Sequence, residues 1–363
     1  MGVIQPKRFA TMELPTKLTR RSRPVAHAPQ PPSHFGPRRI AHNGHLQTML
    51  GTRQARDVIV RGLDQPVLLA AGPDRTGAAP DQPVRLVGYF TPALTSCGSR
   101  GMVLLVHGWE GHSHSPGILT VTDVLARAGY DVFRLNLRDH GPDLHVNRLA
   151  LNRGIFLGTL GDETAAAARS AALLARGKPV HIVGGSMGGS FALRLALAHA
   201  EEPIPNLQSV IAVCPAVNPS RDTRAIDRLQ PYRSYFRRRW LRSLLQKAAL
   251  FPDLYDLNPM RELHGIYEMT EWIIPRYSPY ADAEDYFNHY RVLPSDYERI
   301  GVKTTVIAAE DDFVIPVQDF YEIPKLPLVD VRIYRTGGHM GFVDILPYRQ
   351  WLPRAVLDLL RTA

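Results

Sequence analysis

A short apolar stretch that runs directly into a glycine-rich turn around a serine is the feature that most constrains this chain. Residues 179–183 read Pro-Val-His-Ile-Val, residues 184–188 read Gly-Gly-Ser-Met-Gly, and residues 191–200 have the composition of a helix. A buried strand that ends in G-x-S-x-G and enters a helix predicts a nucleophile elbow, in which glycines permit a tight turn that exposes the serine hydroxyl. Ser186 is therefore the candidate nucleophile of an acyl-transfer reaction.

The pattern of strands and helices around this turn predicts an α/β fold. The predicted strands are 57–60, 67–71, 84–90, 102–106, 131–136, 179–183, 209–214, 303–309 and 331–334, and the predicted helices are 118–128, 162–176, 191–200 and 349–360. The first three strands indicate an antiparallel start to the sheet. From residue 102 on, strands alternate with helices, which predicts a mostly parallel central sheet with helices on both faces.

Residues 216–300 interrupt this alternation and hold 14 of the chain's 30 aromatic residues. Ligand sites in such folds lie at the carboxyl edge of the sheet, so we expect a helical, aromatic-rich cap there, inserted into a core of residues 38–215 and 301–363. The first part of the insertion is rich in arginine and the second part is acidic. A solvated helix face that pairs with the acidic part is the favoured interpretation of the arginines, and a phosphate or lipid-headgroup contact is the alternative.

The net charge of +9 belongs to the N-terminal region. Residues 1–40 carry eight Lys and Arg residues but one acid, so the remainder is nearly neutral. This distribution argues against a nucleic-acid-binding function. The first segment, residues 1–37, is also rich in proline, and we expect a poorly ordered, solvated extension. An organelle address and a peripheral contact with an anionic membrane surface are the alternatives.

The two cysteines, Cys97 and Cys214, are too few for a disulfide framework and indicate free thiols in a reducing compartment. No apolar run reaches the roughly 18 residues that span a membrane. We therefore expect a cytoplasmic protein.

A serine hydroxyl needs a positioned base, and in hydrolases with this elbow an acid and then a histidine follow the serine along the chain. His339 lies in a glycine-rich loop after the last predicted strand and is the candidate base. Three adjacent acids follow the preceding strand. Asp312, four residues before Pro316, is our choice for the acid that orients His339, with Asp311 as the alternative.

The tetrahedral intermediate of acyl transfer needs two backbone N–H donors. One is expected from Met187, the residue after the nucleophile, and the other from Trp109, in the turn that follows the strand 102–106. His107 is interpreted as a structural histidine. His112 and His114 have a spacing found in metal sites but no nearby cysteine or carboxylate cluster, so we expect neither a metal nor a cofactor.

The order His107-Gly108, Gly184-x-Ser186-x-Gly188, Asp312 and His339 resembles the α/β-hydrolase superfamily. Two stretches, residues 44–48 (Gly-His-Leu-Gln-Thr) and residues 106–116, resemble its YheT-like branch, also described as AB hydrolase 4-type. The acidic-aromatic residues 285–287 are also similar to that branch. The resemblance implies an α/β-hydrolase fold, and esterase or lipase activity without a cofactor.

These inferences predict a serine carboxylester hydrolase that acts on small to medium-chain acyl esters or lipid-like esters through an acyl-enzyme. An acyltransferase with the same three residues is the first alternative. A non-catalytic interaction protein that retains the fold is the second. A small-molecule ester is the expected partner, and the sequence leaves the oligomeric state open.

Overall fold

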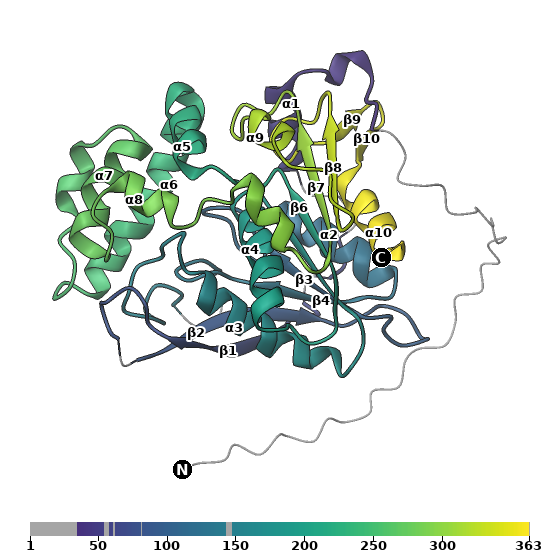
Figure 1. The fold of residues 1–363 in the computed structure, drawn as a ribbon, viewed down its shortest axis with the longest axis horizontal. Helices are drawn as coiled ribbons and strands as arrows, with labels where there is room; N and C mark the ends of the chain where they lie inside the picture. The colour runs from purple at the N-terminus through teal and green to yellow at the C-terminus, as the bar shows by residue number, and fades with distance from the viewer. Residues whose placement is uncertain (1–34, 54–57, 61, 81, 143–146, 363) are drawn as a thin grey trace, which may run out of the picture. The chain divides into compact units, whose positions relative to one another are not determined.

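An eight-stranded sheet forms the centre of the molecule in the computed structural model, which describes residues 35–362 except 54–57, 61, 81 and 143–146 (Figure 1). The strand order is β1-β2-β4-β3-β5-β6-β7-β8. β2 is antiparallel to β1 and β4, and the other neighbours are parallel. The strands are β1 (Gln65–Pro73), β2 (Pro83–Thr91), β3 (Met102–Val106), β4 (Asp131–Leu135), β5 (Val180–Gly185), β6 (Leu207–Val213), β7 (Lys303–Ala309) and β8 (Val329–Tyr334).

Helices cover both faces of this sheet, which confirms the predicted α/β-hydrolase fold class. The α-helices are α1 (Gly44–Gly51), α2 (Pro116–Arg127), α3 (Gly161–Ala172), α4 (Met187–Glu201), α5 (Pro219–Arg228), α6 (Gln230–Leu250), α7 (Ile266–Tyr277), α8 (Ala283–Asn288), α9 (Gln318–Tyr321) and α10 (Leu352–Arg361). Short 3-10 helices span Arg39–Ala41, Leu173–Ala175, Asn258–Glu262 and Pro294–Arg299. A small hairpin of β9 (Val343–Ile345) and β10 (Tyr348–Gln350) precedes α10.

Side chains that alternate in direction along the strands divide the core between the two faces of the sheet. In β3, Leu104 and Val106 pack in a cluster with residues of α3 and α4, whereas Val103 and Leu105 pack in a second cluster with residues of α2 and α10. Successive side chains of a strand point to opposite faces, so a strand covered by helices on both sides must be apolar throughout. β3 meets this requirement, because all five of its residues are buried.

Two expectations about the elements are wrong. Residues 58–60 form no strand, and residue 57 lies outside the described residues; the antiparallel start to the sheet consists of β1 and β2 alone. The closing helix begins at Leu352 rather than residue 349, because residues 348–350 pair with β9 as β10. A three-residue strand is too short to give a recognisable apolar period, and its pairing is decided by the neighbouring chain.

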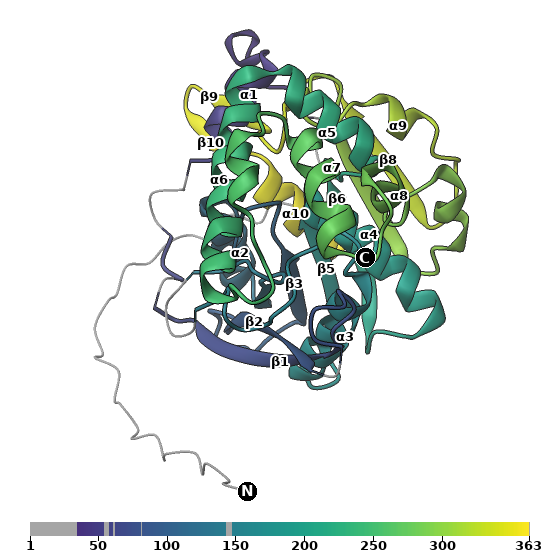
Figure 2. The same ribbon diagram turned by 90° about the vertical axis from the view of Figure 1, so that its left-hand side faces the viewer.

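The segment between β6 and β7 consists of helices, with α5 to α8 grouped together in Figures 1 and 2. Its own apolar cluster includes Leu244 of α6, Ile273 and Ile274 of α7 and Phe287 of α8, and it extends to Leu157 in the loop after β4. The long helices therefore pack on one another and on a loop of the sheet-bearing part. The boundaries of the proposed cap, 216 and 300, stay a prediction.

A buried ion pair joins α6 to the loop after β4. Lys247, fully buried on α6, donates to Asp139 Oδ1 (2.8 Å) and to the carbonyl oxygens of Leu149 (2.9 Å) and Asn152 (2.5 Å). The other carboxylate oxygen of Asp139 accepts from the N–H of Phe156 at 2.9 Å. All three ammonium protons are thus used, which a buried lysine requires.

Most of the predicted extension, residues 1–37, lies outside the described residues. Its end is described: Phe35 is buried and packs on the rings of Tyr334, Phe342 and Trp351. Among the helices that the structure describes, none is long and apolar enough to cross a membrane.

Replacing Lys247 with methionine should lower the free energy of unfolding by about 3–5 kcal/mol, because the buried carboxylate of Asp139 loses its counter-charge. Urea denaturation measures this. Arg242, exposed on the same helix, provides the matched control: R242M should change stability by less than about 0.5 kcal/mol. Equal effects of the two substitutions would contradict the inferred role of the buried pair.

Candidate active site

The backbone at Ser186 has a strained turn, with φ 57° and ψ −126°. β5 leads into this turn and α4 leaves it. A Cβ added at Gly184 would lie 2.0 Å from the carbonyl oxygen of Gly188, and one added at Gly188 would lie 2.3 Å from that of Val106. The glycines are therefore required by close backbone approach, and the turn has the geometry expected of a nucleophile elbow.

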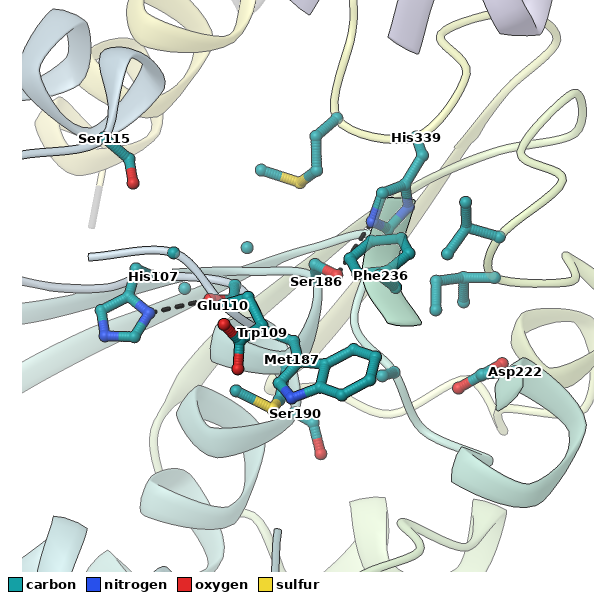
Figure 3. Close-up of a pocket in the computed structure, with 18 of the residues that line it drawn as sticks. His107, Trp109, Glu110, Ser115, Ser186, Met187, Ser190, Asp222, Phe236 and His339 are labelled. Atoms are coloured by element: carbon teal, nitrogen blue, oxygen red, sulfur yellow. Dashed lines mark hydrogen bonds between the residues drawn. The ribbon is translucent and has the colours of Figure 1, made fainter. Parts of the chain in front are cut away.

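Ser186 and His339 are joined by a hydrogen bond of 2.9 Å between Ser186 Oγ and His339 Nε2 (Figure 3). The other ring nitrogen, Nδ1, lies 2.9 Å from Asp312 Oδ2. A carboxylate only accepts, so Nδ1 carries the proton and Nε2 is free to accept from the serine hydroxyl. The structure thus brings Ser186, His339 and Asp312, predicted from separate parts of the sequence, into one hydrogen-bonded line.

The two adjacent acids have different partners. Asp312 uses Oδ1 to accept from the N–H groups of Val314 (2.8 Å) and Ile315 (3.0 Å), which fixes the carboxylate that faces His339. Asp311 accepts from the hydroxyl of Thr336 (2.9 Å) and from the N–H of Gly338 (2.7 Å). Asp311 therefore holds the backbone of the histidine loop and does not contact the imidazole through any hydrogen bond in the described residues.

Helix α1 also holds the histidine loop. The N–H of His339 donates to Thr48 Oγ1 at 2.8 Å, and the Thr48 hydroxyl itself donates to the carbonyl of Gly44. Gln47, fully buried, accepts from the N–H of Val343 (2.7 Å) and donates to the carbonyl oxygens of Val343 and Ala41 (2.8 Å each). These residues of the N-terminal segment 44–48 thus set the position of a histidine almost three hundred residues later.

The two residues predicted to donate to the oxyanion line the same cavity as the serine. Parallel pairing of β3 and β5 sets Val106 opposite Gly184, so the turn after β3 lies next to the elbow. Gly108 leaves little room for a side chain, since an added Cβ would lie 3.3 Å from Ser186 Cβ. Trp109 and Met187 both line the cavity into which Ser186 opens (Figure 3). Neither of their N–H groups has an acceptor within the described part of the chain.

Two histidines hold the turn after β3 in shape. His107 Nδ1–H donates to the carbonyl of Gly108 (2.8 Å), while its Nε2 accepts from the N–H of Leu137 (3.1 Å). His140 Nε2 accepts from the N–H of Glu110 at 3.2 Å. Burial lowers the pKa of His107 well below its ordinary value, helped by the nearby His140. Both ring nitrogens of His107 are occupied, as expected of a structural histidine.

The same turn contacts helix α6. The indole of Trp109 stacks on Phe236 (centroids 5.3 Å apart) and meets Trp240 edge-on (5.4 Å). Arg239 donates to the carbonyl oxygen of Glu110, and Ser243 Oγ donates to the Glu110 carboxylate at 3.0 Å. Arg239 is thus bound to the turn rather than to the acidic part of the insertion. Arg224 does pair with that part, through Glu284 (2.9 Å).

Ser186 and His339 line a cavity of about 900 Å³. The strand ends that reach it belong to β3, β5 and β6, and the opposite wall comes from α5 to α8. Apolar and aromatic side chains dominate its lining, among them Met187, Phe236, Trp240, Leu244, Ile273 and Phe287. A cavity of this size and character suits a largely apolar small molecule.

The roles of several residues could not be found from the sequence, although it had singled out Asp311 as an alternative acid and residues 44–48 for their resemblance to one branch. Asp311, Thr48 and Gln47 act through hydrogen bonds to the histidine loop, and Arg239 acts on the turn after β3. Cys214 is buried beside Asp312, and burial raises the pKa of its thiol well above the ordinary value. Cys214, Asp312 and His339 bring possible metal-ligand atoms within 4.8 Å of one another. The carboxylate and the imidazole, however, are already bonded to each other.

The spacing of His112 and His114 has a local explanation. His114 Nε2 lies 2.8 Å from Asp64 Oδ2, and His112 Nδ1 accepts from the N–H of His114 at 3.1 Å. Burial, with smaller contributions from His114 and Arg239, lowers the pKa of His112 to about 4.

Acid should destabilise this protein through its buried neutral histidines. His107 and His112 have pKa values below the 6.5 of an unfolded chain, so the unfolded state binds protons first as the pH falls. The free energy of unfolding should therefore decrease between pH 6.5 and 5. H112N keeps an acceptor for the N–H of His114 but cannot be protonated, and should reduce this slope by up to about 1.4 kcal/mol per pH unit. Urea titrations at several pH values measure it; identical slopes would contradict the assignment.

Several esterases are among the solved structures that comparison with this chain finds. Est1E from Butyrivibrio proteoclasticus, with ferulic acid bound, has a TM-score of 0.50 and 13% identity, covering 77% of this chain and 95% of that chain. The esterase Pf2001 from Pyrococcus furiosus has a TM-score of 0.49 and 16% identity, covering 85% and 96%. A serine hydrolase from Cycloclasticus zankles has a TM-score of 0.49 and 16% identity, covering 82% and 96%. At 13% identity the likeness to Est1E concerns the fold alone.

Comparison with curated proteins gives no sequence match. The model of a protein family described as "Alpha/beta hydrolase family" matches residues 103–347, which include the elbow serine, the acid and the histidine and make up more than half of the chain. The chain belongs to the alpha/beta hydrolase family.

Proposed function

We propose that this protein is a serine carboxylester hydrolase that acts on small to medium-chain acyl esters or lipid-like esters. The observation that carries the proposal is the line of two 2.9 Å hydrogen bonds from Ser186 Oγ through His339 to Asp312. It ends at a serine that opens into an apolar cavity. This arrangement activates a hydroxyl as a nucleophile, and the apolar lining accepts the hydrocarbon part of an ester.

In this proposal, Ser186 Oγ attacks the acyl carbonyl while His339 Nε2 takes the hydroxyl proton. Asp312 keeps Nδ1 protonated and stabilises the imidazolium. The N–H groups of Trp109 and Met187 donate to the oxyanion of the tetrahedral intermediate. His339 then gives its proton to the leaving alcohol, and the second half repeats these steps with water, which releases the acid and regenerates Ser186.

Membership of the YheT-like branch is part of the same proposal. The segment 44–48, on which that resemblance depends, supplies Thr48 and Gln47 to the histidine loop. The segment that resembles one branch therefore holds the loop of the proposed base in position through hydrogen bonds. The aromatic residues of α6 and α8 favour a medium-length acyl chain or an aromatic ester as the substrate.

A fluorophosphonate probe should label the wild-type protein at Ser186 and leave S186A unlabelled. Loss of the nucleophile should also reduce kcat on p-nitrophenyl esters by roughly 10⁴- to 10⁶-fold. Ser190, one turn along the same helix, is the matched control: S190A should still be labelled. Equal labelling of wild type and S186A would show that the nucleophile is another residue.

The two adjacent acids allow a sharper test of the site. D312N should lower kcat by about 10⁴-fold, since an amide at this position favours the wrong imidazole tautomer. D311N keeps an oxygen that can accept from the N–H of Gly338, so its loss should be much smaller. Steady-state kinetics of both variants on one ester decide this. A larger loss in D311N than in D312N would reverse the assignment of the acid.

A further inference from the structure

One carboxyl group in the cavity has no partner. Asp222 lies on α5, and its side chain is buried, with 4% of the residue exposed. It lines the same cavity as Ser186, and Figure 3 draws it on the side away from His107. Neither of its carboxyl oxygens has a hydrogen-bond partner in the described part of the chain.

Most polar groups near Asp222 are already used, but Asp319 Oδ2 is buried and also has no partner among the described residues. Asp319 is not among the residues that line the cavity. Arg221, the next residue, donates to Asp319 Oδ1 at 2.9 Å, and the amide of Asn218 donates to the same oxygen at 3.3 Å. The side-chain oxygen of Asn218 accepts from the N–H of Arg221. A buried polar group without a hydrogen-bond partner opposes folding, and such groups call for a specific explanation.

A second unpaired group lines the same cavity. Ser190 is buried on α4, and its hydroxyl has no partner among the described residues. Thr270 is the contrasting case, because it is buried on the cavity wall but its hydroxyl donates to the carbonyl of Ile266 at 2.8 Å. The unpaired state of Asp222 and Ser190 is therefore not a general property of polar residues that line the cavity.

The charge of Asp222 narrows the class of ligand. Burial, together with the carboxylates of Asp319 and Asp312, raises the pKa of Asp222 well above its ordinary value, against smaller opposing contributions from the backbone of Asn218 and the guanidinium of Arg221. A protonated carboxyl group both donates and accepts a hydrogen bond. A hydroxyl group has the same two capacities, so it can satisfy both oxygens of the carboxyl without adding a charge to the apolar cavity.

We propose that Asp222 is a specificity-determining residue that binds a hydroxyl group on the acyl or alcohol part of the ester substrate, with Ser190 as a second polar contact in the same cavity. The inference rests on the proposed ester hydrolysis and names its substrate class: oxygenated esters rather than plain hydrocarbon ones. An unsubstituted ester would enter the cavity but leave the carboxyl unpaired, which lowers its transition-state affinity.

The test compares butyl hexanoate with isomers that carry one hydroxyl group at successive positions of either chain, by titration of the acid released. The wild type should prefer at least one hydroxylated ester in kcat/KM by roughly tenfold to hundredfold. D222L should lose this preference while still hydrolysing butyl hexanoate, and D222N, which can donate and accept, should keep most of it. T270V is the matched control and should leave the ratio unchanged.

Three results would overturn the inference. The first is a wild type that prefers no hydroxylated ester. The second is a D222L variant with the wild-type ratio of kcat/KM between hydroxylated and plain esters. The third is a wild type that prefers an ester with an amino group over the ester with a hydroxyl group at the same position. If D222L does not fold, the preference of the wild type for hydroxylated esters in kcat/KM, and the loss of part of that preference in S190A, still test the inference.

A failure of the proposed hydrolysis gives a different pattern. In that case the folded wild type turns over none of the esters. Binding of the uncleaved esters to S186A and to the double variant S186A/D222L, measured by calorimetry, then decides whether Asp222 discriminates the hydroxyl group. Equal dissociation constants for hydroxylated and plain esters in S186A would overturn the inference independently of turnover.

Discussion

Close backbone packing at the ends of β3 and β5 is the constraint on which the site depends. A side chain at Gly188 would overlap the carbonyl oxygens of Val106 and His107, and one at Gly184 would overlap that of Gly188. Because no side chains intervene, the turn after β3 lies against the elbow. The strained φ of Ser186 is maintained by this packing, as expected where strain serves a functional geometry.

Buried polar contacts then fix the parts that the strands alone do not position. The turn after β3 is held from one side by His107 and His140, and from the other by Arg239 and Ser243 of α6. Lys247, farther along α6, pairs with Asp139 next to His140. Helix α6 is therefore bonded both to the proposed oxyanion turn and to the loop that supports it, so its position and the geometry of that turn are linked.

The parallel part of the fold and the three residues of the proposed triad were predictable, because both leave local patterns. Runs such as Val103–Val106 are apolar throughout, and G-x-S-x-G requires glycines at fixed positions. Asp312 and Asp311 are less sharply distinguished by local sequence, since adjacent acids differ only in the direction of their side chains. The hairpin of β9 and β10 and helix α1 were not predicted as elements, because they are short and their contacts are distant in sequence.

The sequence by itself determined the fold class, the elbow and the order of serine, acid and histidine, since periodicity and glycine spacing act within a few residues. Only the tertiary structure decided that Asp312 faces His339, that Thr48 and Gln47 hold the histidine loop, and that Asp222 stays unpaired in the cavity. These facts depend on hydrogen bonds between segments up to 296 residues apart. A hydrogen bond is made or left unmade by positions in space, and nothing in the identity of Asp222 distinguishes it from an acid with a partner.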